Sequence, residues 1–314
     1  MDVFRVLEPG LYTTVQDRGR YGYQQFGIPI SGAMDQFAYR VANLLVGNPE
    51  DSAVLEITVL GPRLEVLAEA DIAVTGAEMP LMVNDRPAEQ WASIRVKPGD
   101  VISLKQVRKG CRAYLAVTGG IDVPVVMGSR STYVGGRIGG YQGRPLSKGD
   151  VLARGPGNPL GSPRRLPEDL LPDLATEITL RAIPGPQDDY FDEGLGIFFD
   201  SVFVVSTQAD RMGYRLQGPV VPHRKGVPQS IISEPSVPGG VQIPPDGQPI
   251  ILLLEQTVGG YTKIATVIST DIDRVAQAKP GDRIKFERVD LETAYGVVRE
   301  REGLMQKIRE MLAG

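Results

Sequence analysis

Lys263 is the residue of this sequence whose type and setting most directly suggest chemistry. It stands in EQTVGGYTKIATVIS, residues 255–269, where a glycine turn and a tyrosine precede a strand-like apolar run. An ammonium group in apolar surroundings can serve as a point charge for a carboxylate. The alternative is a solvated lysine that discourages pairing at a strand edge. This segment and residues 233–250 also place polar residues beside glycine turns, where rigid β scaffolds tend to carry binding sites. The candidates are Glu234, Gln242, Asp246, Glu255, Gln256, Gly259, Gly260 and Tyr261.

A second polar cluster follows an apolar strand in TQADRMGYRLQGP, residues 207–219. It contains Asp210, Arg211 and Arg215 around a Met-Gly pair. A planar guanidinium matches carboxylate and phosphate oxygens bidentately, so these arginines can orient an anionic group.

A third cluster lies in TTVQDRGRYGYQQFGIPISGAMDQ, residues 13–36, just ahead of a predicted helix. Backbone N–H groups and guanidiniums at a helix entrance can hold a carboxylate or a phosphate. The sequence favours the alternative, an internal Asp–Arg network that fixes an N-terminal strand, because such networks are common structural devices. The residues concerned are Gln16, Asp17, Arg18 and Arg20.

The fourth cluster is the glycine-rich run MGSRSTYVGGRIGGYQGRPL, residues 127–146. Glycine is costly to order and is expected where the backbone needs positive φ or a close approach. The run matches neither the P-loop nor the dinucleotide-binding pattern of glycines. It is either a generic anion loop or a flexible surface hairpin, with Arg130, Ser131 and Thr132 as candidates.

Composition excludes several classes of protein. Lys and Arg total 34 against 38 Asp and Glu, and the scattered charges give a net −4, which argues against nucleic acid as a partner. No stretch reaches the ~20 apolar residues of a membrane span. The start, MDVFRVLEPG, lacks a signal peptide's pattern, so we expect no membrane association and a cytoplasmic location. The single Cys111, expected in the core, and the single His223 argue against disulfide, triad and metal chemistry.

The secondary-structure signal is mostly β. Short β-branched segments cut by Gly, Pro, Asn or Asp predict compact barrels or sandwiches with a few short helices. One helix is well signalled in SGAMDQFAYRVANLLVGNP, residues 31–49, with Ser31 as its cap and Gly47-Asn48-Pro49 as its end. A shorter helix is predicted over 271–278 and a C-terminal one over about 291–312.

Residues 155–173 are rich in Pro and Gly without an apolar period, which is typical of a linker. The predicted domains are 1–154 and 174–290, followed by a C-terminal helix in 291–314. VKPGDVISL and AKPGDRIKF place the same turn before a strand in each half, and LSKGDVLA repeats it in shorter form. Either a common β-turn or a duplication explains this.

Taken in order, the motifs resemble the family that contains the C subunit of 5-oxoprolinase, also called KipA, and the carboxyltransferase domain of urea carboxylase. The resemblance runs from about Val6 to Val289 and includes QDRGRYGYQQFGIPISGAMD, NPEDSAVLEIT, GRIGGYQGRPLSKGD, ADRMGYRL, QIPPDGQPI and TVGGYTKIATVISTD. It implies two tandem cyclophilin-like β-barrel domains with a site between them. The GGYTKIAT turn would face that site, opposite the loop after Gln16.

The resemblance further implies the C subunit of a prokaryotic ATP-dependent 5-oxoprolinase, which acts with the A and B subunits to convert 5-oxo-L-proline to L-glutamate. The substrate would be a small amide or lactam. ATP would be bound by the complex, and the partner subunit is one candidate for holding it. A biotin carrier has its lysine between methionines, and no Met-Lys-Met occurs here, so no biotin is expected on this chain.

In that scheme Arg130 and Arg211 would orient carboxylate or phosphoryl oxygens. Lys263 would offset negative charge as it develops. Asp17 or Asp210 would hold these cations in place.

The remaining candidates would contact the substrate, with glutamine amides hydrogen-bonding the lactam. They are Gln16, Arg18, Arg20, Ser131, Thr132, Arg215, Gln242, Gln256, Gly259, Gly260 and Tyr261.

Two other functions are compatible with the same resemblance. One is biotin-dependent carboxyl transfer to urea or another amide. The other is a KipA-type regulator that sequesters a KipI-like kinase inhibitor. In this case the KipI-like protein is the B subunit, and it is the partner of this chain. The gene neighbourhood would distinguish a carboxyltransferase from an oxoprolinase. ATP hydrolysis that depends on 5-oxoproline would distinguish an oxoprolinase from a regulator.

Overall fold

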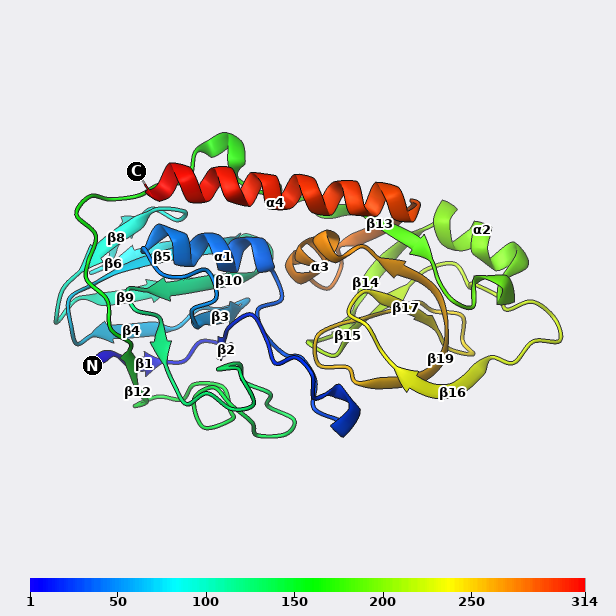
Figure 1. Cartoon of the computed structure of the whole chain (residues 1–314), viewed down its shortest axis with the longest axis horizontal. Helices are drawn as coiled ribbons and strands as arrows, with labels where there is room; N and C mark the ends of the chain where they lie inside the picture. The colour runs from blue at the N-terminus through cyan, green and yellow to red at the C-terminus, as the bar shows by residue number, and fades with distance from the viewer. Residues whose placement is uncertain (314) are drawn as a thin grey trace. The chain divides into compact units, whose positions relative to one another are not determined.

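The computed structural model describes residues 1–313, which divide into two compact units (Figure 1). Unit 1 comprises Met1–Arg20, Ser31–Leu174 and the chain from Met305 onward, and unit 2 comprises Tyr21–Ile30 and Ala175–Leu304. Gln24 shows why the short early segment belongs to unit 2, because its side-chain amide donates to the carbonyls of Ser236 and Thr257 at 2.6 and 3.1 Å. The units are therefore not the continuous halves that the Pro/Gly-rich segment suggests.

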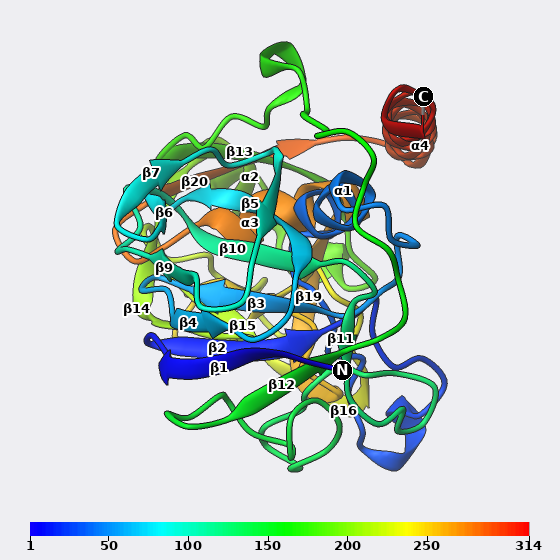
Figure 2. The ribbon, with the colours of Figure 1, turned by 90° about the vertical axis from the view of Figure 1, so that its left-hand side faces the viewer.

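Unit 1 is built from two sheets and one main helix. The seven-stranded sheet has the order β11-β12-β1-β4-β9-β6-β7, and the five-stranded sheet has the order β2-β3-β10-β5-β8. The antiparallel pair β1 and β12 lies side by side in Figure 2. The elements are β1 (Asp2–Glu8), β2 (Tyr12–Gln16), α1 (Gln36–Leu45), β3 (Val54–Thr58), β4 (Arg63–Val66), β5 (Ala70–Glu78), β6 (Leu81–Val83), β7 (Arg86–Ala88), β8 (Ser93–Val96), β9 (Val101–Leu104), β10 (Lys109–Val117), β11 (Ile121–Asp122), β12 (Val151–Arg154) and η2 (Glu168–Leu170), with η1 (Gln24–Phe26) in the segment assigned to unit 2.

The core of unit 1 comes from alternating apolar residues of both sheets. Phe4 of β1, Leu55 of β3 and Leu115 of β10 are fully buried in one cluster. Alternation places every second side chain of a strand on the same face, so a β-branched, alternating sequence folds with one face inward. Cys111 is buried and free, as predicted.

Unit 2 is a closed barrel with one added strand. Its eight strands have the order β13-β20-β14-β15-β18-β17-β19-β16, and β13 also pairs with β19, which closes seven of them into a ring. Phe198, Phe203 and Phe286 fill part of its interior, with the rings of Phe198 and Phe286 stacked at 4.3 Å. The elements are β13 (Glu177–Pro184), η3 (Asp188–Tyr190), α2 (Asp192–Asp200), β14 (Val202–Ala209), β15 (Gly213–Gln217), β16 (Ser230–Pro235), β17 (Gly240–Ile243), β18 (Ile250–Leu252), β19 (Val258–Val267), η4 (Ser269–Asp271), α3 (Ile272–Gln277), β20 (Arg283–Arg288) and α4 (Leu291–Ala313), whose last residues are assigned to unit 1.

Strand β19 changes partners along its length. Its first residues pair with β16, from Val258 to Tyr261, and its last residues pair with β13, from Ala265 to Val267. The glycines of GGYTKIAT therefore lie inside a strand, and the predicted glycine turn is wrong there. Glycine lacks a side chain, so it allows close approach across a sheet, which the turn prediction overlooked.

The mainly β prediction is confirmed, and the helices differ in detail. Helix α1 begins at Gln36, and its cap is Asp35, whose carboxylate accepts the Ala38 N–H at 2.9 Å. Ser31 is therefore not the cap, because the chain turns once more before the helix begins. The helix ends before Gly47 with φ of 75°, as predicted.

Two further helices agree with the sequence, and one does not. Helices α3 and α4 occupy the predicted segments. Helix α2 is not indicated by the sequence, and its last residues fall in FFDSVFVVST, the apolar segment that was expected to form the strand before the second polar cluster. Two glycines in α2 weaken the helical signal, and tertiary packing of Phe198 outweighs that local preference.

The repeated Gly-Asp turn has the same hydrogen bonds at all three places. In each, the Asp carboxylate accepts the N–H three residues earlier, at 2.7 Å for Asp100, 2.7 Å for Asp150 and 3.0 Å for Asp282. The preceding glycines have φ between 89° and 94°, which L side chains rarely adopt. Because two of the three turns lie in unit 1, a recurring β-turn explains the similar sequences in the two halves without a duplication.

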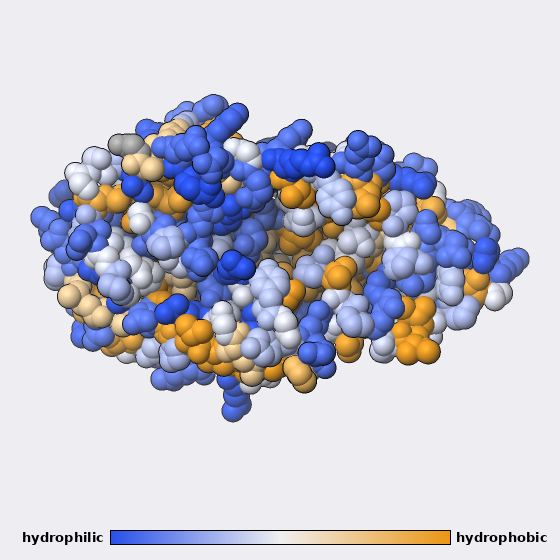
Figure 3. All heavy atoms as spheres, in the orientation of Figure 1, coloured by the Kyte–Doolittle hydropathy of each residue, from blue (hydrophilic) through white to orange (hydrophobic). Residues whose placement is uncertain are grey.

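Figure 3 shows hydrophilic residues over most of the face drawn, with hydrophobic residues in separate groups. No helix of residues 1–313 is both long and apolar enough to cross a bilayer.

Candidate functional site

Asp17 is the centre of a buried network in unit 1. Its carboxylate accepts four hydrogen bonds, from the Gly19 and Arg130 N–H groups and from the Ser129 and Ser131 hydroxyls, at 2.5–2.9 Å. Asp17 thus holds the backbone, and not the guanidinium, of Arg130. The predicted carboxylate–cation contact is wrong here, because the loop turns the Arg130 side chain toward the Val123 carbonyl.

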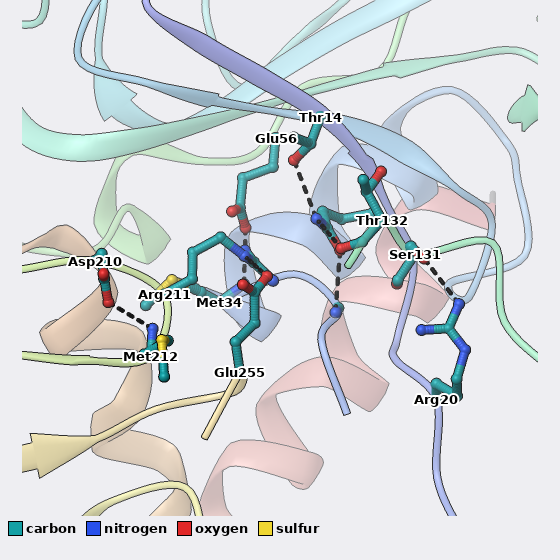
Figure 4. A network of polar contacts seen from close by, with 12 residues as sticks. Thr14, Arg20, Met34, Glu56, Ser131, Thr132, Asp210, Arg211, Met212 and Glu255 are labelled. Atoms are coloured by element: carbon teal, nitrogen blue, oxygen red, sulfur yellow. Dashed lines mark hydrogen bonds and ion pairs between the residues drawn. The ribbon is translucent and has the colours of Figure 1, made fainter. Parts of the chain in front are cut away.

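Gln16 and Arg20 extend the same network, of which Figure 4 labels Thr14, Arg20, Ser131 and Thr132. The Gln16 amide donates to Thr14 and to the Thr132 carbonyl and accepts the Gly32 N–H, and the Arg20 guanidinium donates to the Ser131 carbonyl at 2.9 Å. These bonds tie the end of β2 to the glycine-rich loop, which is the internal alternative that the sequence favours. A substrate role for this set stays a prediction. Arg18, by contrast, is exposed.

The glycine-rich loop borders a hollow of about 530 Å³ in unit 1. Its walls come from β11, β12 and the loop, and include Val123, Arg137, Tyr141 and Val151. Arg137 and Gln142 have φ of 55° and 58°, and four glycines of the loop, Gly128, Gly139, Gly140 and Gly143, have positive φ as well. The loop therefore has a specific compact conformation rather than that of a simple hairpin.

Glu56, a buried carboxylate of β3, is a residue that the sequence reasoning missed. It accepts the Met34 N–H at 2.8 Å (Figure 4) and the Tyr114 hydroxyl at 2.9 Å, with the Arg112 guanidinium 3.9 Å away. Burial and the Glu56 charge raise the pKa of Tyr114 well above its usual value. The signal that could have identified it is a charged residue within the apolar run AVLEIT, which was used only as part of the motif NPEDSAVLEIT.

In unit 2, Arg211 pairs with Glu255 and not with Asp210. The Arg211 Nε and Glu255 Oε1 lie 2.6 Å apart, and the two side chains are 6% and 9% exposed (Figure 4). Asp210 instead accepts the Met212 N–H at 2.7 Å and the Gly213 N–H at 3.2 Å. The assignment of Asp210 to a cation is therefore corrected, because its short side chain closes the turn before β15.

Lys263 lies where β19 passes from one neighbouring strand to the next. Its backbone N–H donates to the side-chain oxygen of Gln187 at 2.9 Å. This bond gives the N–H a partner at the point where β19 has left the β16 ladder and has not yet joined the β13 ladder. Its ammonium pairs with the Glu234 carboxylate of β16, and the side chains are 6% and 44% exposed. The solvated-edge alternative is therefore wrong, because this lysine is buried.

Gln242 of β17 is the neighbour of Lys263 in the ladder. It is 3% exposed, and its Nε2 has no hydrogen-bond partner in residues 1–313. Its amide lies against Gly259, where an added Cβ would be 2.3 Å from Nε2. Gly259 pairs with Glu234, so an ammonium, a carboxylate and an unused amide donor gather around one glycine. A cation beside a neutral donor can bind a small polar anion.

The other predicted residues of unit 2 lie in less enclosed positions. Arg215 is 3.8 Å from Asp246, with both side chains partly exposed. Gln256 donates to the Val258 carbonyl two residues on, and Tyr261 is exposed on β19. Gly260 is next to Ser233 of β16. Among residues 1–313 no group of three His, Cys, Asp or Glu residues could hold a metal ion.

His223 is partly buried near strand β19. Its Nε2 is 2.8 Å from the Thr262 hydroxyl, and its ring is 4.6 Å from that of Phe191. Burial lowers the pKa of His223 below its usual value of 6.5.

We expect unit 2 to lose stability as the pH falls through 6.5, because the unfolded chain then binds a proton that the buried imidazole resists. The chain has one histidine, so its NMR signal gives the pKa directly, and the midpoint should lie below 6.5. His223→Gln should remove this part of the pH dependence of unfolding. A midpoint at or above 6.5 would contradict the expectation.

Fold and site together define a mainly β protein of two units, the second a closed barrel with an ion pair and an amide at a strand junction. A family model described as the carboxyltransferase domain, subdomain A and B, matches residues 26–288. The chain belongs to this family, which confirms the resemblance seen in the motifs.

Relatives and solved structures agree with this placement. The chain is 40% identical over 296 residues to the C subunit of the 5-oxoprolinase of Escherichia coli (strain K12), covering 93% of each. It is 34% identical over 309 residues to the C subunit of the 5-oxoprolinase of Haemophilus influenzae, covering 98% of each. The crystal structure of the Kluyveromyces lactis urea amidolyase matches with a TM-score of 0.92 and 35% identity, over 98% of this chain but only 20% of that one.

Proposed function

We propose that this chain is the C subunit of an ATP-dependent 5-oxoprolinase, acting with the A and B subunits to convert 5-oxo-L-proline to L-glutamate. The observation that carries the proposal is the 40% identity to a protein of that name over 93% of both chains. The urea amidolyase relatives match with 35% identity or less, and only over 18% or less of their length.

The chemistry of a lactam agrees with a site that has both a cation and an amide donor. The amide C–N bond has partial double-bond character, so its opening needs activation. Transfer of the terminal phosphoryl group of ATP to the lactam oxygen releases ADP. Attack of water at the same carbon then breaks the C–N bond, and hydrolysis of the resulting acyl phosphate releases phosphate. Lys263 and Gln242 are the residues of this chain that we assign to holding the lactam acid for these steps.

Glutamate release from 5-oxo-L-proline with ATP tests the proposal, using the purified A and B subunits with and without this protein. Turnover is expected only when the chain is present. No turnover, with all three proteins folded and associated, would reject it.

A carboxyltransferase acting on a neutral amide is the second candidate, favoured by the TM-score of 0.92 to urea amidolyase. It predicts consumption of carboxybiotin that depends on urea, with no response to 5-oxo-L-proline. The regulatory alternative predicts binding to the B subunit without turnover of either substrate.

A further inference from the structure

The ion pair of Lys263 and Glu234 is unequal in its exposure to water. The ammonium belongs to a side chain 6% exposed, whereas the carboxylate belongs to one 44% exposed. Glu234 can therefore leave the contact and be solvated at small cost. Lys263 cannot, because an uncompensated buried charge is strongly unfavourable. Whatever displaces Glu234 must bring a negative charge of its own.

The strand that carries Glu234 is suited to such a displacement. Among the described residues, strand β16 is the end strand of the sheet, and its one strand partner is β19. Its register shifts between Ser230 and Glu234, and Ile232 between them is 93% exposed. Ser233 and Pro235 on either side of Glu234 are exposed as well, and local opening is favoured where a segment buries little of its surface.

Gln242 is the independent sign of a ligand. Its Nε2 is buried and has no acceptor among residues 1–313, and burying an amide donor that bonds nothing is unfavourable. Its amide lies over Gly259, directly across the ladder from Glu234. A ligand that takes the place of the Glu234 carboxylate would lie within the same small region as this donor.

We propose that Glu234 stands in for the carboxylate of the substrate, and that Lys263 and Gln242 form a subsite for a small carboxylic acid that also carries a carbonyl acceptor. The ligand's carboxylate replaces Glu234 at the ammonium, and its amide oxygen accepts from Gln242. The inference rests on the proposed function and sharpens it, because it selects a lactam acid over a neutral amide. It also assigns Lys263 to the acid group rather than to charge that develops on the lactam oxygen.

The test compares binding of 5-oxo-L-proline and 2-pyrrolidinone, the same lactam without the acid group, to the full chain by titration calorimetry. Wild type should prefer 5-oxo-L-proline. Glu234→Gln removes the internal competitor and should tighten the binding of 5-oxo-L-proline by about tenfold. This is expected if the state with Glu234 bound to Lys263 dominates the free protein. The affinity for 2-pyrrolidinone should not change. Glu193→Gln, an exposed change in α2, is the matched control.

Two results would overturn the inference: equal affinity of wild type for both lactams, or no gain in Glu234→Gln. Because that variant could fold poorly, hydrogen exchange of wild type gives a second measure. Saturating 5-oxo-L-proline should speed exchange of the amides of β16, and unchanged or slower exchange there would count against displacement of Glu234.

The outcome is separable from that of the proposed function. If glutamate is released but Glu234→Gln does not change the affinity for 5-oxo-L-proline, the subsite is rejected and the oxoprolinase function is retained. Selective binding of the acid with no glutamate release keeps the subsite and rejects the oxoprolinase.

Discussion

Lys263→Met is expected to lower kcat/KM for glutamate release by about 100-fold in the three-subunit enzyme. This is the size of effect expected when one partner of a buried charge pair between protein and ligand is removed. Methionine keeps an unbranched side chain, one atom shorter than that of lysine, and removes the ammonium group. The loss should appear mainly as a raised KM, because the subsite binds the acid group in the ground state. Initial rates over a range of 5-oxo-L-proline concentrations measure both parameters.

The stability of the same variant separates a lost site from a lost fold. Glu234 is partly exposed and remains solvated without its partner, and replacing a buried charge by an apolar side chain is often neutral or stabilising. The melting temperature should therefore not fall. Lys285→Met, an exposed lysine of β20, is the matched control and should keep full activity. More than half of the wild-type kcat/KM in Lys263→Met would remove Lys263 from the site.

Asp17→Ala should cost unit 1 about 3 kcal/mol or more of unfolding free energy, because it leaves buried donors without an acceptor. The carboxylate accepts four hydrogen bonds that join β2 to the glycine-rich loop. Urea unfolding followed by tryptophan fluorescence measures this selectively. The single Trp91 is 8% exposed and belongs to unit 1.

Asp122→Ala is the control for that measurement. Asp122 is 53% exposed and contacts Arg130 at 3.8 Å, so the change should stay within about 0.5 kcal/mol of wild type. An equal, small effect of both substitutions would show that the Asp17 network does not stabilise unit 1.

Features set by neighbouring residues were predictable from the sequence. The Gly-Asp turns, the end of α1 at Gly47 and the alternating strands depend on local geometry, and the structure has them where the pattern indicates. The start of α1 was displaced because Ser31 and Asp35 are both good caps, and only the folded loop selects one.

The partners of charged side chains were not predictable in the same way. Glu255 and Glu234 stand 44 and 29 residues from the cations that they bind. Both cations were identified as candidates, but the sequence nearest to Arg211 suggested Asp210. The choice between these carboxylates depends on strand register, which no local pattern specifies. The unused donor of Gln242 likewise follows from its approach to Gly259 across the sheet.

The discontinuous make-up of the units has a consequence for synthesis on the ribosome. Unit 1 receives its final segment only after Met305, where Ile308 and Leu312 are buried and Arg309 bonds Glu50 at 2.7 Å. Unit 2 needs Tyr21–Ile30, made early, and Ala175–Leu304, made late. The usual order, in which an N-terminal domain is finished while the next is still being translated, is therefore not open to this chain. A gene divided at the Pro/Gly-rich segment would encode two fragments, each lacking a part that the other carries.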